Sequence, residues 1–314
     1  MTVSAAGIHA AGDNTGRAGT SGSFLRMGLG ARAMGMGGGS PVLGDDGLAG
    51  YYNPAALSML EGRWFSAALH TMPFDRRISY LGYAQSFGPA PGDGDGKTRA
   101  GFGLGWLYAG VDRIDGRDFN GSHTEMLSAG EHCFYFSFAL NPLDFLAIGG
   151  SGKLLNHRLS GVSDGGTLSA VGLGFDLGVY LKPMSGVRIG FTLRDVGSQY
   201  SWDTQEVYEF GTQRTDEFPV VAEGGLSFQL YDGRLLSYVS IEKIQYRKAT
   251  VSTGIEAEPI RRLFVRCGVD RGVPAVGGGY LTILGKLNMR LDYALTADPV
   301  SMQENHLFTW SLIF

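Results

Sequence analysis

Long segments of strict alternation between apolar and small or polar residues recur along this chain from position 63 to its end. In residues 132–140, for example, Phe134, Phe136 and Phe138 share one face. A repeat of two residues is the signature of a β-strand. These segments run to about ten residues, whereas a strand of a soluble β-sandwich runs to about five or six. The alternation therefore indicates strands that are too long and too aromatic on one face for an ordinary sandwich.

Lipid would cover this aromatic surface, for which the rest of the sequence provides no second layer. A transmembrane barrel needs segments of about 9 to 11 residues, apolar outward and polar inward, closed so that no edge amide faces hydrocarbon. The sequence therefore predicts an all-β fold, a transmembrane antiparallel β-barrel of about 14 strands. The expected strands are approximately 63–73, 77–87, 99–110, 131–140, 145–157, 168–182, 187–198, 218–230, 234–245, 249–259, 262–270, 274–282, 285–296 and 305–314. The aromatic residues expected to face lipid include Phe102, Trp106, Phe134, Phe136, Phe175 and Phe308.

Long and short connections alternate between these strands, as they do in bacterial barrels with short periplasmic turns. The expected outward loops are 111–130, 158–167, 199–217 and 297–304, and the inward turns include "NPLD", "KPMSG", "YDGR" and "EPIR". The long segment 88–98 lies on the side of the short turns and is the one exception. The alternation predicts that both chain ends of the barrel lie in the periplasm.

The end of the chain gives an independent indication of the same fold. Phe308, Trp310, Leu312 and the terminal Phe314 share one face of the last expected strand. A final strand that ends in phenylalanine resembles the signature by which outer-membrane proteins are recognised for insertion. We therefore expect these four residues to form an insertion signal.

Composition excludes several classes of protein. The formal net charge is -4 and no run of Lys and Arg occurs, so we expect no nucleic-acid partner. No stretch approaches the roughly 18 apolar residues of a membrane helix. Residues 1–20 lack the basic and apolar regions of a signal peptide, so an exported protein would here be a mature or truncated chain. Cys133 and Cys267 match no metal spacing and are interpreted as packing residues, with a disulfide as the alternative.

Two glycine-rich stretches imitate nucleotide-binding loops. "GLGARA" follows no apolar strand and opens no βαβ unit, so it does not predict a dinucleotide site. "GGSGKLL", residues 149–155, has Leu154 where a phosphate loop needs Ser or Thr, and it lies within an expected strand. No catalytic motif occurs and the six histidines are scattered. The sequence therefore predicts no enzyme, no cofactor and no metal site.

The segment "GARAMGMGGGSPVLGDDGLAGYYNPAALSML", residues 30–60, resembles the N-terminal signature of the PorV/PorQ family of outer-membrane proteins. Its "NPAAL" end is similar to the hatch of the wider FadL fatty-acid transporter group. Segments 171–183, 187–197, 254–259, 263–272 and 291–295 fall where such proteins carry similar strands. The resemblance implies a fourteen-stranded barrel of the bacterial outer membrane, with a flexible segment at 1–27, a lumenal hatch or plug at 28–60 and the barrel at 61–314.

The residues of this segment suit a plug. Glycine allows sharp turns and close backbone contact with a wall, and inward-facing glycines such as Gly101 and Gly178 would thin that wall. Asp45 and Asp46 are expected to cap a short helix or to meet cations in the lumen. The candidate hatch residues are Gly35, Gly37, Gly38, Asp45, Asp46, Asn53 and Pro54.

Charged residues on the expected inward faces allow two interpretations. They are either a paired polar core that fills the barrel or the lining of a selective channel. The set comprises Asp176, Arg188, Arg194, Glu256, Arg266, Asp270, Arg290 and Asp292.

Three functions follow from these observations. The PorV/PorQ resemblance implies protein handling in type IX secretion, with outer-membrane lipid and other outer-membrane or secreted proteins as partners. The aromatic residues Tyr200, Trp202, Tyr208 and Phe210 of an outward loop are candidates for binding such partners, although girdle aromatics look the same. The alternatives are a FadL-like transporter of long-chain fatty acids or other hydrophobic compounds, and a structural barrel without transport. The polar, glycine-rich inward faces favour protein handling over fatty-acid transport.

Overall fold

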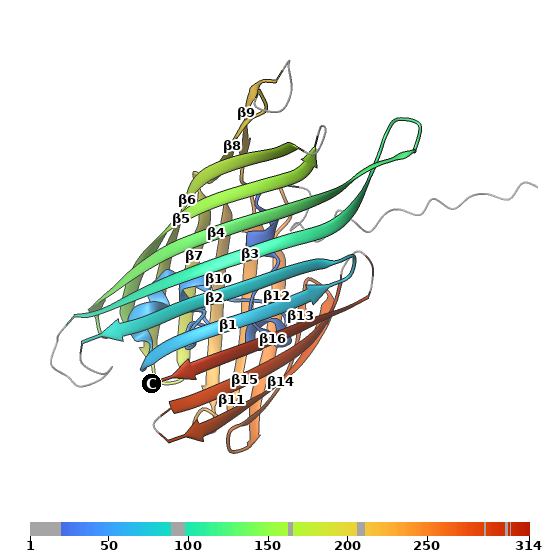
Figure 1. Cartoon of the computed structure of the whole chain (residues 1–314). Coiled ribbons are helices and arrows are strands. Elements are labelled where there is room, and N and C mark those ends of the chain that lie inside the picture. Colours follow the sequence, from blue (N-terminus) through green and yellow to red (C-terminus); the bar gives the residue numbers. More distant parts are fainter. Residues whose placement is uncertain are drawn as a thin grey trace, which may run out of the picture.

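The computed structural model describes residues 20–88, 98–162, 166–205, 211–285, 287–298, 301 and 303–314 (Figure 1). Fourteen antiparallel strands close into a barrel, because β1 pairs with β16 and each remaining strand pairs with its neighbours around the ring. The predicted fold class is therefore confirmed. No helix in these residues is long and apolar enough to cross a membrane.

The strands of the barrel follow the expected order. They are β1 (Arg63–Met72), β2 (Arg76–Phe87), β3 (Arg99–Arg117), β4 (His123–Leu143), β5 (Leu146–Val162), β6 (Gly166–Met184), β7 (Val187–Val196), β10 (Val221–Leu230), β11 (Leu235–Ile244), β12 (Thr250–Ile260), β13 (Leu263–Asp270), β14 (Val273–Leu284), β15 (Leu287–Ala297) and β16 (Glu304–Ile313). A hairpin of β8 (Gln199–Asp203) and β9 (Gln213–Glu217) attaches to β6 through Ala170 and Val171.

Short helices precede the first strand. They are η2 (Ser23–Arg26), α1 (Ala31–Gly35), α2 (Ala49–Tyr52) and η3 (Pro54–Met59). Asn53 caps η3 by accepting a hydrogen bond from the Ala55 N–H at 3.1 Å, and Pro54 fills the first helical position, where its missing N–H is harmless. The helices and the turns between them lie inside the ring of strands (Figure 1).

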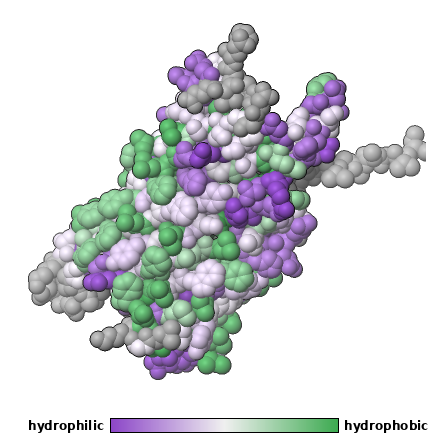
Figure 2. Space-filling view, viewed as in Figure 1, coloured by the Kyte–Doolittle hydropathy of each residue, from purple (hydrophilic) through white to green (hydrophobic). Residues whose placement is uncertain are grey.

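The outer face of the barrel is apolar. Phe134, Phe136 and Phe175 are 52 to 56% exposed, although they lie on long central strands. Trp106 and Phe308 are also exposed, and Phe102 is half-buried. Figure 2 shows hydrophobic side chains over the flank of the barrel and hydrophilic ones at its ends. This distribution suits a lipid-facing band between two aqueous boundaries.

On one side of the barrel, the strands β3 to β6 extend farther beyond the outer end than the sequence predicts. The expected loop 111–130 is largely an extension of β3 and β4, which pair as far as Arg117 and His123, and β5 and β6 likewise extend over the expected loop 158–167. Beyond Arg76, β2 no longer accompanies β3, so these strands project past the rim. Outside the membrane an outward face need not be apolar, so the alternation fades while backbone pairing continues.

Replacing Phe136 with arginine tests the membrane assignment. A charge on the lipid face near the bilayer midplane should destabilise the barrel by about 2 to 4 kcal/mol, because hydrocarbon solvates it poorly. Urea unfolding in lipid vesicles measures the loss, and Phe119→Arg at a fully exposed hairpin tip serves as the control. A Phe136→Arg barrel as stable as the control, or a wild-type chain that is monomeric and soluble without detergent, would refute the assignment.

Candidate functional site in the barrel lumen

The N-terminal segment, here residues 20–60, packs directly on the inner wall. A Cβ atom on Gly101 would lie 2.3 Å from the Leu57 carbonyl carbon, and one on Gly254 would lie 1.8 Å from the Met36 oxygen. Only glycine allows the backbone to approach so closely. Residues 20–27, assigned to a flexible segment by the sequence analysis, include Phe24, Leu25 and Arg26, which are only 2 to 3% exposed.

The candidate hatch residues lie within this segment and contact the wall. A Cβ atom on Gly35 would lie 3.0 Å from the Gly277 Cα, and one on Gly37 would lie 2.4 Å from the backbone nitrogen of Val269, which belongs to the wall. Gly38 lies beside Asp270 and has a φ of +102°, a conformation that favours glycine. The side chain of the buried Asn53 donates to the Val179 carbonyl at 3.0 Å, which ties the Asn53–Pro54 turn to β6.

A charge cluster in the half of the lumen nearer the short turns, here called the lower charge cluster, joins the segment to both sides of the barrel. Arg32 of α1 pairs with Asp45, Asp46 and Glu256, and Asp45 pairs in turn with Arg188 at 2.9 Å. The Asp46 carboxylate also accepts a hydrogen bond from the Leu48 N–H, but no side chain caps α2, and η3 is capped by Asn53 rather than by Asp45 or Asp46. A chain of charges thus crosses the lumen from β12 to β7.

Wall residues extend the lower charge cluster. Arg266 pairs with Glu256 and with Asp292 at 2.8 Å, and Arg290 pairs with the same two carboxylates at 3.3 and 3.0 Å. Each arginine therefore faces a carboxylate, as expected for a paired polar core. Of the two interpretations of these charges, this geometry favours the filled core over an open channel lining.

An upper charge cluster lies near the other end of the lumen. Lys153 of β5 pairs with Asp176 at 2.7 Å and with Asp195 at 2.8 Å, and Arg26 lies 3.7 Å from Asp195. The predicted Arg194 pairs close by with Glu223 and Glu242 at 3.3 and 3.0 Å. Asp270, also predicted to face the lumen, accepts a hydrogen bond from Ser252 at 2.7 Å.

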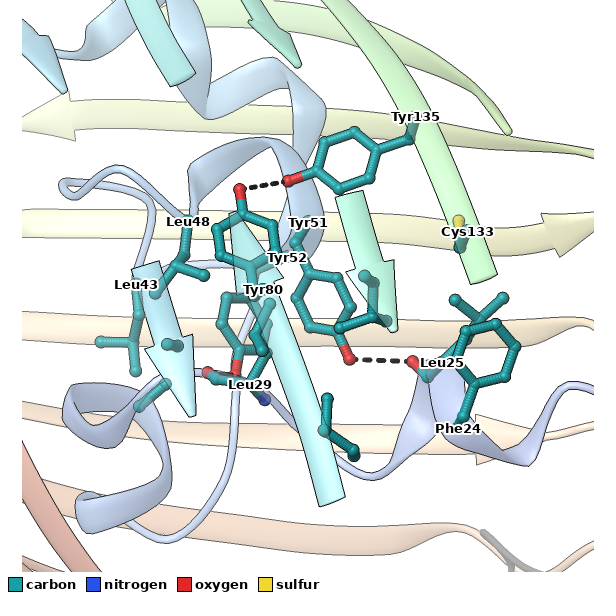
Figure 3. Packing of buried hydrophobic residues seen from close by; sticks show 14 of the residues in the cluster. Phe24, Leu25, Leu29, Leu43, Leu48, Tyr51, Tyr52, Tyr80, Cys133 and Tyr135 are labelled. Atoms are coloured by element: carbon teal, nitrogen blue, oxygen red, sulfur yellow. Dashed lines mark hydrogen bonds between the residues drawn. The ribbon is translucent and has the colours of Figure 1, made fainter. Parts of the chain in front are cut away.

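A packed cluster of buried apolar side chains lies beside the upper charge cluster, and because the N-terminal segment fills it we call this part of the lumen the apolar chamber. Tyr80, Leu107, Cys133 and Leu155 are direct neighbours in register on β2 to β5, and each is at most 4% exposed. Phe24 and Leu25 of η2 belong to the same packed cluster (Figure 3). The Tyr51 hydroxyl donates to the Leu25 carbonyl at 2.9 Å and holds η2 there. The N-terminal segment thus occupies an apolar space in the outer half of the lumen.

The wall beside the chamber is interrupted. On one side of β6, residues 172–174 pair with β5. On its other side, the pairing with β8 ends at Val171 and the pairing with β7 begins at Phe175, so residues 172–174 lie in a gap between these two pairings. Here the chain after β7 crosses the inner face of β6, since a Cβ atom on Gly174 would lie 2.1 Å from the Ser198 hydroxyl. Asp195 starts this crossing at a φ of 61°. The crossing brings Asp195 to Lys153 and the upper charge cluster.

The candidate partner-binding residues divide into two pairs. Tyr200 is 1% exposed and its ring packs on Phe218 at 4.9 Å between centroids, so it faces the chamber rather than a partner. Trp202 is half-buried and its indole donates to Asp216 at 3.0 Å. Tyr208 and Phe210 lie outside the described residues.

Three of the expected insertion residues lie on the outer face of β16, and the fourth, Phe314, directly follows this strand. Phe308, Trp310, Leu312 and Phe314 are 37 to 49% exposed, and Phe314 bonds through its backbone to Arg63 at the start of β1. Cys133 and Cys267 are free thiols, one buried and one exposed. Within the described residues no group of three His, Cys, Asp or Glu side chains could hold a metal ion.

The sequence pattern did not identify Arg32, Lys153, Asp195 or the apolar chamber as parts of the site. Lys153 lies in "GGSGKLL", which resembles a phosphate loop in sequence but forms part of β5. Lys153 alternates with Ser151 and Leu155 along β5 and therefore faces inward. A lysine inside the barrel needs a carboxylate partner, and this signal could have identified it. The chamber could not be recognised from the pattern, because the inward faces are mostly polar or glycine and only isolated apolar residues interrupt them. In the chamber these residues include Leu107, Cys133 and Leu155.

Comparison with known proteins agrees with this architecture. No protein-family model and no curated protein matches the chain. Among solved structures, the toluene transporter TbuX of Ralstonia pickettii is 16% identical, with a TM-score of 0.65 over 91% of this chain and 98% of that one. The Pseudomonas putida toluene transporter TodX gives 16% and 0.62 over 91% and 96%, and a Pseudomonas aeruginosa FadL homologue gives 12% and 0.60 over 91% and 98%.

These likenesses define a class by its fold. The chain is a fourteen-stranded barrel with the fold of the FadL-type outer-membrane proteins.

Proposed function

We propose that this protein transports small hydrophobic molecules across the bacterial outer membrane, with the N-terminal segment as its hatch. The observation that carries the proposal is the apolar chamber in the outer half of the lumen, filled by the chain's own Phe24 and Leu25. Neighbours in fold are named as transporters of toluene, which supports the same class of substrate. This function differs from the protein handling that the sequence analysis favoured.

The extended strands β3 to β6 supply a route into the chamber. An apolar row crosses β3 to β6 above the chamber and consists of paired residues on neighbouring strands, Val111, Ala129, Leu159 and Leu168. These residues lie an even number of positions from Cys133 and Leu155 or pair with residues that do, so they face inward as well. All four are half-buried, so this apolar row is accessible from outside. We infer that a hydrophobic molecule first contacts this row and then displaces η2 from the chamber.

The interruption in the wall supplies a route out of the chamber. η3 lies below the chamber and contacts β2 to β6, which closes the direct path to the periplasm. Residues 172–174 border the chamber where the ladder to β7 is broken, and the crossing chain at Ser198 and Gln199 packs against their inner face. We therefore place the exit here, with the salt bridge of Lys153 and Asp195 holding the crossing chain in the closed state.

Replacing Phe24 with alanine tests the chamber. The variant should take up radiolabelled toluene faster than the wild type, because the ring that fills the chamber is gone, and it should lose about 3 kcal/mol of stability. Uptake is measured in cells that lack the native protein, with Phe228→Ala, which removes a lipid-facing ring, as the control. Equal uptake by the two folded variants would contradict the chamber as the transport route.

Protein handling, as in the PorV/PorQ family, is the second candidate. The long hairpin of β3 and β4 favours it, because its tip presents a fully exposed Phe119 and Met126 on the same hairpin is 61% exposed. The tip is well held, since hydrogen bonds from His123 and Arg117 fix Asp115 and keep the pKa of that carboxyl below its usual value. A secretion defect caused by Phe119→Ala with normal toluene uptake would favour this candidate.

A further inference from the structure

The lipid-facing side of the barrel carries an apolar groove of about 440 Å³ across β13 to β16. Gly278 of β14 forms its floor, since the register places this glycine between Val265 of β13 and Tyr293 of β15. Tyr280 and Trp310 stand on either side of Leu291 in the next row. These side chains are at least partly exposed on the outer face of the barrel.

Packing inside the barrel does not explain the glycine at the floor. Gly277 and Gly279 face inward, where a Cβ atom would lie 3.1 Å from the Gly35 Cα and 2.2 Å from an Asp292 carboxylate oxygen, respectively, so the packed lumen favours glycine at both positions. Gly278 faces outward, and the nearest atom to its Cβ position is the Phe264 carbonyl oxygen at 3.7 Å. A larger residue would fit at this position, and it would fill the groove.

A basic cluster lies at the periplasmic end of the groove. Arg261 and Arg262 form the turn that precedes Leu263, and Leu263 pairs with Tyr280 at the groove's edge. Leu263 lies two residues before Val265, which pairs with Gly278, so the turn is about 7 Å along the strand from the floor of the groove. The N–H of Glu258 donates to the carbonyl of Arg234, so a third arginine lies on the adjacent turn. Asp232 lies on that same turn, so three arginines stand beside two carboxylates, Asp232 and Glu258, and this end keeps a net positive charge.

We propose that the groove and these arginines bind one glycerophospholipid from the inner leaflet of the membrane. The phosphate lies at Arg261 and Arg262, and one acyl chain runs upward over Gly278 between the aromatic side chains. The charge favours an anionic headgroup, and the apolar lining favours an acyl chain over a polar ligand. The site is separate from the lumen, so it does not depend on the proposed transport.

Native mass spectrometry of the purified barrel tests this site with phosphatidylglycerol as the probe. Gly278→Leu should weaken phosphatidylglycerol binding about tenfold, equivalent to about 1.4 kcal/mol, because the leucine occupies the floor. Gly152→Leu is the matched control, since Gly152 also faces lipid and nothing lies within 4 Å of its Cβ position. Arg261→Glu should weaken binding of phosphatidylglycerol but not of an uncharged diacylglycerol, and inorganic phosphate should not compete.

Equal binding by the wild type, Gly278→Leu and Arg261→Glu would overturn the proposal. So would a dimer that Gly278→Leu disrupts, because a second copy would then fill the groove. If Gly278→Leu does not fold, Tyr293→Ala removes one side of the groove without adding bulk and should weaken binding in the same way. Binding unchanged in Tyr293→Ala would then overturn the proposal.

Discussion

Replacing Arg32 with methionine should destabilise the protein by about 3 to 5 kcal/mol, because removing one partner leaves buried charges unpaired. Arg32 is 5% exposed and joins Asp45 and Asp46 of its own segment to Glu256 of the wall. Urea unfolding in lipid vesicles measures the loss. Arg214→Met is the control, since its ion pair with Asp216 is exposed and should contribute less than about 1 kcal/mol.

A second substitution shows how much of the loss of stability in Arg32→Met comes from unpaired carboxylates and how much from lost packing. Glu256 retains Arg266 and Arg290 as partners, whereas Asp45 retains only Arg188 among the arginines that it contacts. Adding Asp45→Asn to Arg32→Met should therefore recover part of the loss. If Arg32→Met costs no more than the exposed control, the lower charge cluster does not hold the segment.

Replacing Gly254 with valine should expel part of the N-terminal segment from the lumen. The new Cβ atom would lie 1.8 Å from the Met36 oxygen, and the neighbouring Gly268 is packed equally tightly at 2.0 Å. Backbone cannot yield as a side chain does, so we expect a loss above the roughly 1 to 3 kcal/mol of ordinary overpacking. Protease should then cut within residues 28–60 of folded Gly254→Val barrels.

Two controls accompany this experiment. Wild-type barrels should resist cleavage in the same segment, because these residues are buried against the wall. Gly152→Val adds the same bulk on the lipid face, where nothing lies within 4 Å, and should also resist. Rapid removal of residues 28–60 from intact wild-type barrels would show that this segment is not a plug.

Most of the barrel could be predicted from the sequence, because each membrane-spanning residue must face either lipid or the lumen. Phe134, Phe136 and Phe138 alternate for this reason, and β4 indeed contains them. The same rule fails above the membrane, where β3 and β4 continue beyond the expected limits. No outward lipid face imposes alternation there, and the register shifts near Ile114.

The lumen was harder to predict because its contacts join residues far apart in sequence. Inward parity identified Arg188, Glu256, Arg266 and Asp292, but nothing local marked Arg32 as the cation that connects them. Local sequence also gave no sign that β7 turns inward after Asp195. That turn depends on Gly172 and Gly174, which belong to another strand and leave room for Ser198 and Gln199.

Uptake of radiolabelled toluene and retention of secreted proteins, measured together in one deletion strain, test the proposed function most directly. We expect the strain to lose toluene uptake and to secrete normally, with the wild-type gene restoring uptake. Long-chain fatty acid measured in parallel defines the range of substrates. Normal uptake of both compounds together with defective secretion would contradict transport and favour protein handling.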